Sequence, residues 1–295
     1  MRKCVIDIGT NTFNLLIAEH SPEELKIIYS TKRGVALGMG GITKGVLTKD
    51  AMFRAIEALI EFEIKIKEFE VSDVRLIATA AVREANNSLA FLELVKKEVG
   101  RDVLIIDGQQ EAKFIFQGVS MCHKFQSESM IMDIGGGSTE FIRANQNGIG
   151  ELISLKIGVS RLYQTFSCSD PFTKSDVEKI ESYIENESKG FFCNKNVECL
   201  IGSSGTFETF YELIHKKKYP FSSETMELEV QPFMESLNDL IFSTQDERNK
   251  NEFIIPIRKK MAPFAAVKTR WVLQQLNVKK VLISPFSLKE GALSE

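Results

Sequence analysis

The chain has few of the residues from which disulfide frameworks and zinc sites are built. Its 295 residues include only five cysteines, three histidines and one tryptophan. The cysteines are odd in number and widely spaced, and no C-x-x-C pair occurs among them. This pattern favours buried free thiols over disulfides or zinc ligands.

Long apolar runs and an excess of basic charge are also lacking. The first apolar run is short and contains Asp7, and no later run is long enough to span a bilayer. We therefore expect no signal peptide, no membrane segment and a cytoplasmic location. The formal net charge of -3 argues against a general nucleic-acid binder, because such proteins rely on a broad basic surface.

The composition is that of an ordinary globular protein, with 43% hydrophobic and 26% charged residues. The length of 295 residues fits two domains of roughly 100 to 200 residues each. Apolar periodicity and turn residues indicate a mixed order of strands and helices in the first half. The expected elements are strands 4–8, 13–19, 25–30, 74–78 and 103–106, and helices 48–69, 88–98 and 109–119. In helix 48–69, Thr48 is the expected N-cap, and Met52, Ile56, Ile60 and Ile64 belong to the expected buried face.

A repeat at a distance of 126 residues indicates a duplicated chain. Residues 5–13, VIDIGTNTF, align with residues 131–139, IMDIGGGST, and apolar strands follow both copies. The second half continues with expected strands 141–144, 151–156, 198–201 and 280–284 and helices 174–189, 232–242 and 263–276. We place the domain boundary in the polar stretch 120–128, which predicts domains 1–124 and 125–295 and a hinge between them.

Three glycine-rich loops have the composition of phosphate sites, because glycine lets backbone N–H groups approach an anion and Ser and Thr add hydroxyl donors. The loops are Gly9, Thr10, Asn11, Thr12; then Gly135, Gly136, Gly137, Ser138, Thr139; and then Gly202, Ser203, Ser204, Gly205, Thr206. Asp7 and Asp133 stand where a strand enters its loop, a position suited to holding Mg²⁺. A single loop of this kind is more often a simple turn, but the duplication predicts two facing loops and a cleft.

At this point the chain resembles the exopolyphosphatase and guanosine pentaphosphate phosphohydrolase family, within the superfamily of actin, sugar kinases and the seventy-kilodalton heat-shock chaperones. The matching stretches are VIDIGTNTFNLL (5–16), ATAAVREAN (78–86), IDGQQEAKFIFQGV (106–119), MDIGGGSTEF (132–141), SLKIGVSRL (154–162) and IGSSGT (201–206). The resemblance implies an α/β fold of two ribonuclease H-like (actin-like ATPase) domains, with mixed five-stranded sheets and a cleft between them.

The same resemblance implies roles for single residues. Glu111 matches the family's catalytic Glu and is the expected general base, which activates water for attack on the terminal phosphorus. Arg83 is expected to contact phosphate or the developing charge of the transition state. Glu140 matches an acid that helps to hold metal or water. Without the family, Glu111 would read as a helix-start carboxylate and Arg83 as a solvated loop residue.

The chain departs from the family pattern at two places. Ala36 stands where many relatives have a basic residue, with Lys32 just upstream, so a phosphate contact is lost or displaced. Arg258-Lys259-Lys260 replaces an Arg-Ala-Asp-like sequence, so an expected acid is missing. Basic clusters at residues 216–218, 258–260 with Lys268 and Arg270, and 279–280 are candidates for a polyanion path, although such runs are more often solvated faces.

The leading hypothesis is a Mg²⁺-dependent exopolyphosphatase that hydrolyses the terminal phosphoanhydride of polyphosphate and releases orthophosphate. Two alternatives remain: a guanosine pentaphosphate phosphohydrolase, and a binding or sensing protein with a degraded catalytic site. A kinase or actin-like ATPase shares the fold but matches the motifs less well. By analogy with the family we also expect a homodimer.

Overall fold

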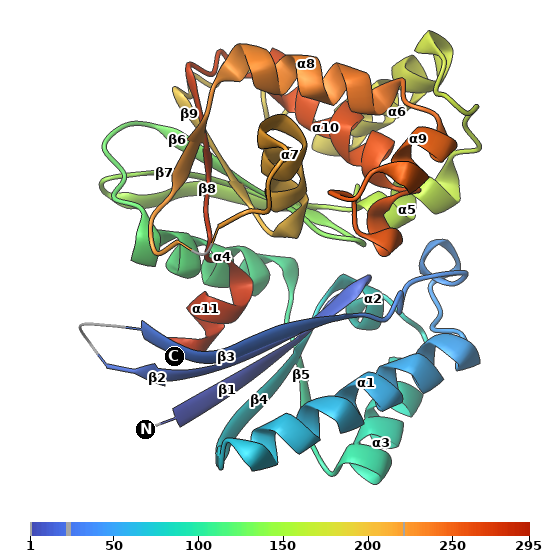
Figure 1. The fold of residues 1–295 in the computed structure, drawn as a ribbon, viewed down its shortest axis with the longest axis vertical. Coiled ribbons are helices and arrows are strands. Elements are labelled where there is room, and N and C mark those ends of the chain that lie inside the picture. The colour runs from blue at the N-terminus through green and yellow to red at the C-terminus, as the bar shows by residue number, and fades with distance from the viewer. Residues whose placement is uncertain (1, 22–24, 221) are drawn as a thin grey trace.

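The computed structural model describes residues 2–21, 25–220 and 222–295, and it shows two α/β lobes stacked one above the other (Figure 1). The strands of the first lobe are β1 (Arg2–Ile8), β2 (Thr12–His20), β3 (Leu25–Gly34), β4 (Asp73–Ala78) and β5 (Val103–Ile105). Its helices are α1 (Lys49–Glu68), α2 (Ala80–Arg83) and α3 (Ser88–Val99), with a 3-10 turn η1 (Ile42–Lys44).

The second lobe has the strands β6 (Ser129–Ile134), β7 (Thr139–Asn145), β8 (Gly148–Leu155), β9 (Cys199–Ser203), β10 (Met226–Leu228) and β11 (Lys280–Ile283). Its helices are α5 (Val159–Thr165), α6 (Lys174–Ser188), α7 (Gly205–His215), α8 (Val230–Ile241), α9 (Gln245–Lys250) and α10 (Ala262–Gln275), with a 3-10 turn η2 (Pro256–Arg258). Two further helices, α4 (Gly108–Cys122) and α11 (Leu288–Leu293), lie between the lobes (Figure 1).

The two sheets repeat one topology. The first has the order β3-β2-β1-β4-β5 and the second the order β10-β11-β9-β6-β7-β8. In both, the hairpin strands pair antiparallel, and the first strand of the repeat pairs parallel with a later one. This arrangement confirms the duplicated, mixed α/β fold. One detail differs, because the second sheet has a sixth strand, β10, whose three residues are too short to show a pattern in the sequence.

Three apolar cores hold the molecule together. One packs the first sheet against α1 and α3, and a second packs the second sheet against α6, α8 and α10. The third is shared, because it joins the opposite faces of both sheets through α4 and α11. The C-terminal helix α11 therefore contacts β1, β2 and α4. The domain boundary between residues 124 and 125 stays a prediction.

The prediction of the buried face of α1 was partly wrong. Thr48 caps it as expected, since its Oγ1 accepts a hydrogen bond from the Ala51 backbone N–H at 3.2 Å. Met52 and Ile56 are buried, but Ile60 and Ile64 are 45% and 61% exposed. The buried face is formed instead by Ala51, Ala55, Leu59, Phe62 and Ile66, which recur every three or four positions and pack against the first sheet.

Candidate functional site

Strand alternation points the predicted acids toward the layer formed by α4 and α11. Val5 lies in the shared core, and side chains two residues apart in a strand share a face, so Asp7 faces the same layer. Ile131 also lies in the shared core, which places Asp133 there in the same way. Asp133 pairs in register with Glu140 on β7, directly across the strands. The repeat thus delivers the acids of both hairpins to one place.

A cavity of about 330 Å³ opens at this place between the lobes. Its walls include the predicted residues Asp7, Gly9, Thr10, Asn11, Thr12, Glu111, Asp133, Gly135, Gly136, Gly137, Ser138, Ser204, Gly205 and Thr206. The remaining predicted residues do not line the cavity: Arg83, Thr139, Glu140, Gly202 and Ser203. The structure therefore brings the three glycine-rich loops and the acids together around one space.

The two hairpin loops approach each other closely across the cleft. A Cβ atom built onto Gly136 would lie 2.8 Å from the Cβ of Thr10, and one built onto Gly137 would lie 2.8 Å from the Thr10 Oγ1. Both distances are shorter than van der Waals contact allows, so glycine is required at these positions for the loops to face each other. Ser160 adds a link, since its hydroxyl hydrogen-bonds to Asn11.

The third loop ends in a strained residue that leads directly into α7. Ser204 has φ 74°, a left-handed conformation that is unusual for a residue with a side chain. Its side chain makes no capping hydrogen bond to α7. The first N–H groups of a helix have no partner within the helix and favour an anion. Because Ser204, Gly205 and Thr206 line the cavity, this helix start is suited to a phosphate.

Glu111 lies in the first turn of α4 and is held by Arg83. Asp107 caps the helix by accepting a hydrogen bond from the Gln110 backbone N–H at 2.8 Å, so Glu111 is not needed as a cap. Arg83 Nη1 donates to Glu111 Oε2 at 2.7 Å and to the Ile106 carbonyl at 3.0 Å. Burial, and then the charge of Glu140, raise the pKa of Glu111 well above its ordinary value, although Arg83 opposes this.

Glu140 is buried behind the second loop. Its Oε1 accepts a hydrogen bond from Ser154 Oγ at 2.7 Å, and burial raises its pKa to about 7. Lys268, on α10, reaches the same region from the other side. Its Nζ donates to Thr139 Oγ1 at 2.6 Å and to the Ile157 carbonyl at 2.7 Å. Lys268 is fully buried, so its place in a polyanion path was a wrong prediction, and burial lowers its pKa to about 7.

The two aspartates differ in their partners. Asp7 Oδ2 accepts a hydrogen bond from Asn14 Nδ2 at 2.8 Å, and burial raises the pKa of Asp7 to about 6. Asp133 accepts a hydrogen bond from Ser287 Oγ, and burial raises its pKa as well. Asp133 also raises the pKa of Asp7 through its charge. Within the described parts of the chain, no group of three or more His, Cys, Asp or Glu residues could hold a metal.

The two carboxylates of Asp7 and Asp133 suit Mg²⁺ better than Zn²⁺. Mg²⁺ is usually bound through one or two carboxylates, waters and the phosphates of the substrate, whereas zinc needs three or four protein ligands. Asp7 and Asp133 supply two carboxylates to the cavity, and burial raises the pKa of both, a cost that a bound cation would offset. We assign these two side chains as candidate cation ligands.

Among the described residues, three basic side chains line the cavity beside the predicted ones: Lys32, Arg258 and Lys289. Lys289 could not be predicted, because nothing in the sequence shows that α11 returns to the space between the lobes. Lys289 Nζ pairs with Glu290 at 2.8 Å. Arg258 Nη1 donates to the Gly205 carbonyl at 2.6 Å, so the departure from the family pattern leaves a cation in contact with the third loop.

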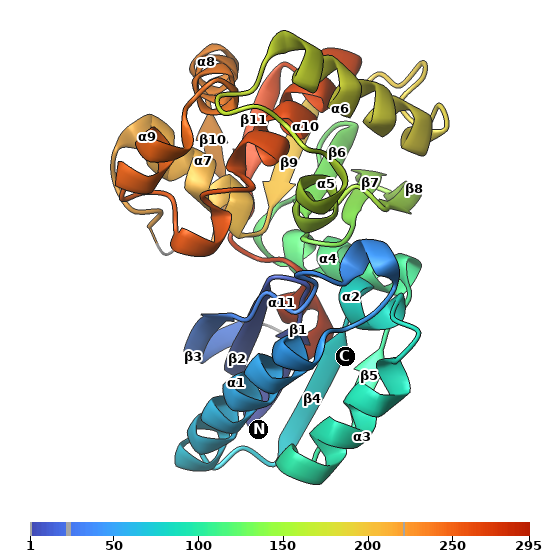
Figure 2. The same ribbon diagram turned by 90° about the vertical axis from the view of Figure 1, so that its right-hand side faces the viewer.

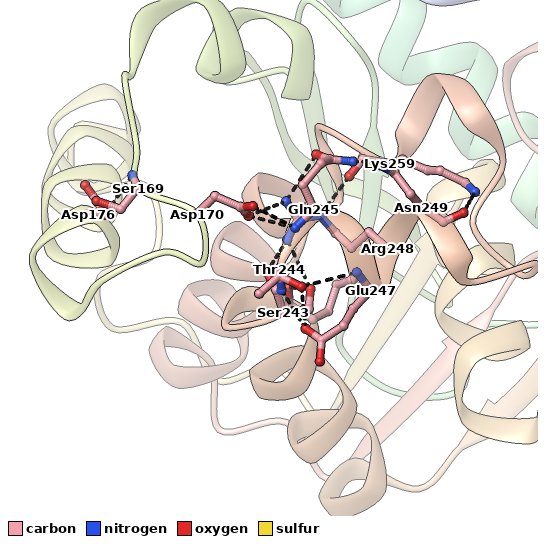
Figure 3. Close-up of polar contacts among 11 residues, drawn as sticks. Ser169, Asp170, Asp176, Ser243, Thr244, Gln245, Glu247, Arg248, Asn249 and Lys259 are labelled. Carbon is pink, nitrogen blue, oxygen red and sulfur yellow. Dashed lines mark hydrogen bonds and ion pairs between the residues drawn. The ribbon is translucent and has the colours of Figure 1, made fainter.

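The segment that carries Arg258 is anchored from behind by Arg248 on α9 (Figure 3). Arg248 is 4% exposed, and its Nε donates to the Lys259 carbonyl at 2.9 Å. Its Nη2 forms an ion pair with Asp170 at 3.1 Å, and its Nη1 donates to the Ser243 carbonyl. One buried guanidinium therefore joins three chain segments and fixes the backbone next to Arg258.

No helix among the described residues is long and apolar enough to cross a membrane. Comparison with solved structures finds an exopolyphosphatase from Cytophaga hutchinsonii with a TM-score of 0.95 and 36% identity, covering 99% of this chain and 96% of that one. The PPX-GPPA enzyme of Aquifex aeolicus matches with a TM-score of 0.83 and 30% identity, covering 100% of this chain and 99% of that one.

Among curated proteins, a guanosine-5'-triphosphate,3'-diphosphate pyrophosphatase of Aliivibrio fischeri strain MJ11 is 26% identical over 212 residues, which are 71% of this chain and 43% of that protein. A protein of the same name from strain ES114 is 33% identical over 153 residues, which are 52% of this chain and 31% of that protein. The chain thus spans less than half the length of these curated relatives. The model of the Ppx/GppA phosphatase family matches residues 16–295, and the chain belongs to this family.

Proposed function

We propose that the protein is an exopolyphosphatase, which hydrolyses the terminal phosphoanhydride of polyphosphate and releases orthophosphate. The observation that carries the proposal is the convergence of three phosphate-type loops, a buried glutamate and two aspartates on one cavity. Such a site offers many donors for a chain end made only of phosphates, and a buried base for water. The similar solved structure from Cytophaga hutchinsonii, titled an exopolyphosphatase, supports the same substrate class.

In the proposed reaction the terminal phosphate lies among the backbone N–H groups of the two hairpin loops and of α7. A water molecule attacks the terminal phosphorus, its proton passes to Glu111, and the bond from phosphorus to the bridging oxygen breaks. The products are orthophosphate and a chain shorter by one phosphate. Arg83 holds Glu111 Oε2, so Oε1 is the oxygen that we assign to the water.

The environment of Glu111 suits this role. A general base works best when its pKa is near the working pH. Burial raises the pKa of Glu111 well above its ordinary value, which makes the carboxylate a stronger base than an exposed glutamate. Glu140 does not line the cavity, so we assign it a role through Glu111, because its charge helps to raise the pKa of that base. Charged groups in a site closed to water act more strongly than they do in solution.

A divalent cation, Mg²⁺, would be held by Asp7 and Asp133 together with the phosphates. When bound, it would neutralise phosphate charge and polarise the phosphoryl oxygens. The cytoplasmic location and the homodimer stay predictions.

Guanosine pentaphosphate is the second candidate substrate. The observation that favours it is the similarity to two Aliivibrio proteins named as guanosine-5'-triphosphate,3'-diphosphate pyrophosphatases. The reaction would be the same, because both substrates end in a phosphoanhydride. The third hypothesis, a binding or sensing protein, fits less well, since Glu111, Arg83 and both aspartate loops are present and assembled.

The test is orthophosphate release from polyphosphate and from guanosine pentaphosphate, with Mg²⁺ and with EDTA. Glu111→Gln keeps the shape of the side chain and removes the base, so we expect a loss of roughly 10²-fold or more in kcat. Glu61→Gln is the matched control, because Glu61 is an exposed partner of Arg33 outside the cavity. The ratio of the two rates decides the substrate. Tight binding without turnover of either would make the protein a sensor and refute the proposal.

A further inference from the structure

An ion pair between the two lobes stands at one side of the cavity. Lys32 on β3 and Glu208 on α7 both line the cavity, and Lys32 Nζ lies 3.2 Å from Glu208 Oε2. Their side chains are 48% and 33% exposed, whereas the side chain of Glu111 is 9% exposed. The pair therefore marks the solvent end of the cavity, and Glu111 marks the closed end.

The opposite side of the cleft is closed by contacts of α5. Gln164 accepts a hydrogen bond from the Gly40 backbone N–H at 2.8 Å, and its Nε2 donates to the Gly38 carbonyl at 3.2 Å. Arg161 pairs with Glu84 at 2.8 Å and donates to the Gly137 carbonyl at 3.1 Å. Figure 2 shows α5 and the loop before α1 on one side of the molecule, and β3 and α7 on the other. A chain whose end lies at Glu111 leaves the cavity past Lys32 and Glu208.

Glu208 puts a negative charge on this path. Although burial works to raise its pKa, Lys32 and then Arg258 hold the pKa of Glu208 below its ordinary value. The carboxylate is thus ionised at neutral pH and repels phosphates that pass it. Lys32 pairs with Glu208, so a passing phosphate that binds the Lys32 ammonium competes with this carboxylate for the same positive charge. Arg258 and Lys289 also line the cavity, but each has a partner of its own, the Gly205 carbonyl and Glu290.

We propose that the Lys32–Glu208 pair determines the preferred substrate chain length: a chain that extends beyond the pair must compete with Glu208 for Lys32, and a chain that ends before the pair need not. The inference rests on the proposed function, since it concerns phosphate chains bound at the same site. Lys32 then favours long chains and Glu208 disfavours them. The two residues of this ion pair are therefore expected to change the preference for long over short chains in opposite directions.

The experiment compares kcat/KM for long-chain polyphosphate with kcat/KM for tripolyphosphate. Glu208→Gln removes the repulsive charge, so the ratio of long to short should rise about fivefold, the effect of one unit charge at about 4 Å in water. Lys32→Met leaves Glu208 unpaired, so the ratio should fall by a similar factor. Glu61→Gln removes the same charge beside Arg33, the neighbour of Lys32, and should leave the ratio unchanged.

A purely structural bridge would behave differently. If the pair only holds the lobes together, both variants loosen the same contact and shift the ratio in the same direction or not at all, and either result overturns the inference. Dissociation constants for both chains, measured by calorimetry, test the same opposite shifts without turnover. Absence of hydrolysis by the native protein would refute the proposed function, whereas unchanged binding ratios would refute the chain-length role.

Discussion

Replacing Glu140 by glutamine should make the protein more stable and less active. Glu140 is 1% exposed, and its Oε1 accepts a hydrogen bond from Ser154. Glutamine keeps the shape and the accepting oxygen and removes the charge. Burial of that charge is the main reason why the pKa of Glu140 is raised to about 7, so the carboxylate costs stability once it is ionised.

The magnitude follows from the raised pKa. The ordinary value is 4.5 and the value in the folded chain is about 7, which corresponds to about 3 kcal/mol at 1.36 kcal/mol per tenfold change. The folded state binds more protons than the unfolded state between these two values, so stability is lost as pH rises through this window. Above this window the charge of Lys268 does little to offset the cost of the ionised Glu140. The pKa of Lys268 is itself lowered to about 7, so its amine is then largely neutral.

Urea unfolding, followed by circular dichroism in EDTA, measures the effect. At about pH 8 the free energy of unfolding of Glu140→Gln should exceed that of the native protein by up to about 3 kcal/mol, and at about pH 5 the two should nearly agree. Orthophosphate release should fall, since the charge that helps to raise the pKa of the base Glu111 is lost. Glu61→Gln should show neither effect. A variant that is less stable at pH 8, or equally stabilised at both pH values, would refute the reasoning.

Two further predictions concern the groups behind the cavity. Arg248→Ala removes the donor to the Lys259 carbonyl, so it should lower the free energy of unfolding by at least about 2 kcal/mol. Arg248→Lys should recover only part of this, because lysine lacks the planar fork, and full recovery in urea unfolding would contradict it. Lys268→Met removes the donor to Thr139 and Ile157. Because the pKa of Lys268 is lowered from 10.5 to about 7, native stability should rise with pH across this window. The free energy of unfolding of the variant should therefore fall relative to that of the native protein as pH rises through this window. A difference in urea unfolding that does not change with pH would count against a buried amine with a lowered pKa.

Much of the fold could be predicted because the sequence repeats itself. The copies at residues 5–13 and 131–139 predicted two hairpins of one type, and the sheets confirm this in their order and pairing. Apolar periodicity also predicted most strands and the capped start of α1. Apolar periodicity did not predict the whole buried side of α1 correctly, since Ile60 and Ile64 were expected to be buried and are exposed. Helix α1 has apolar residues on more than one side, and only its packing against the first sheet decides which of them are buried.

The sequence by itself determined the three glycine-rich loops and the two aspartates of the candidate site, because glycine, serine and aspartate at strand ends have local geometric causes. Glu111, Arg83 and Glu140 were expected only from the family resemblance. Tertiary structure alone decided what surrounds them. Arg83 meets Glu111, Lys32 meets Glu208, and Lys289 returns on α11 to the same cavity. The raised pKa values of Asp7 and Glu140 also arise there, because desolvation depends on segments that are distant in the chain. A local sequence pattern does not predict which distant segment of the chain will bury a given side chain.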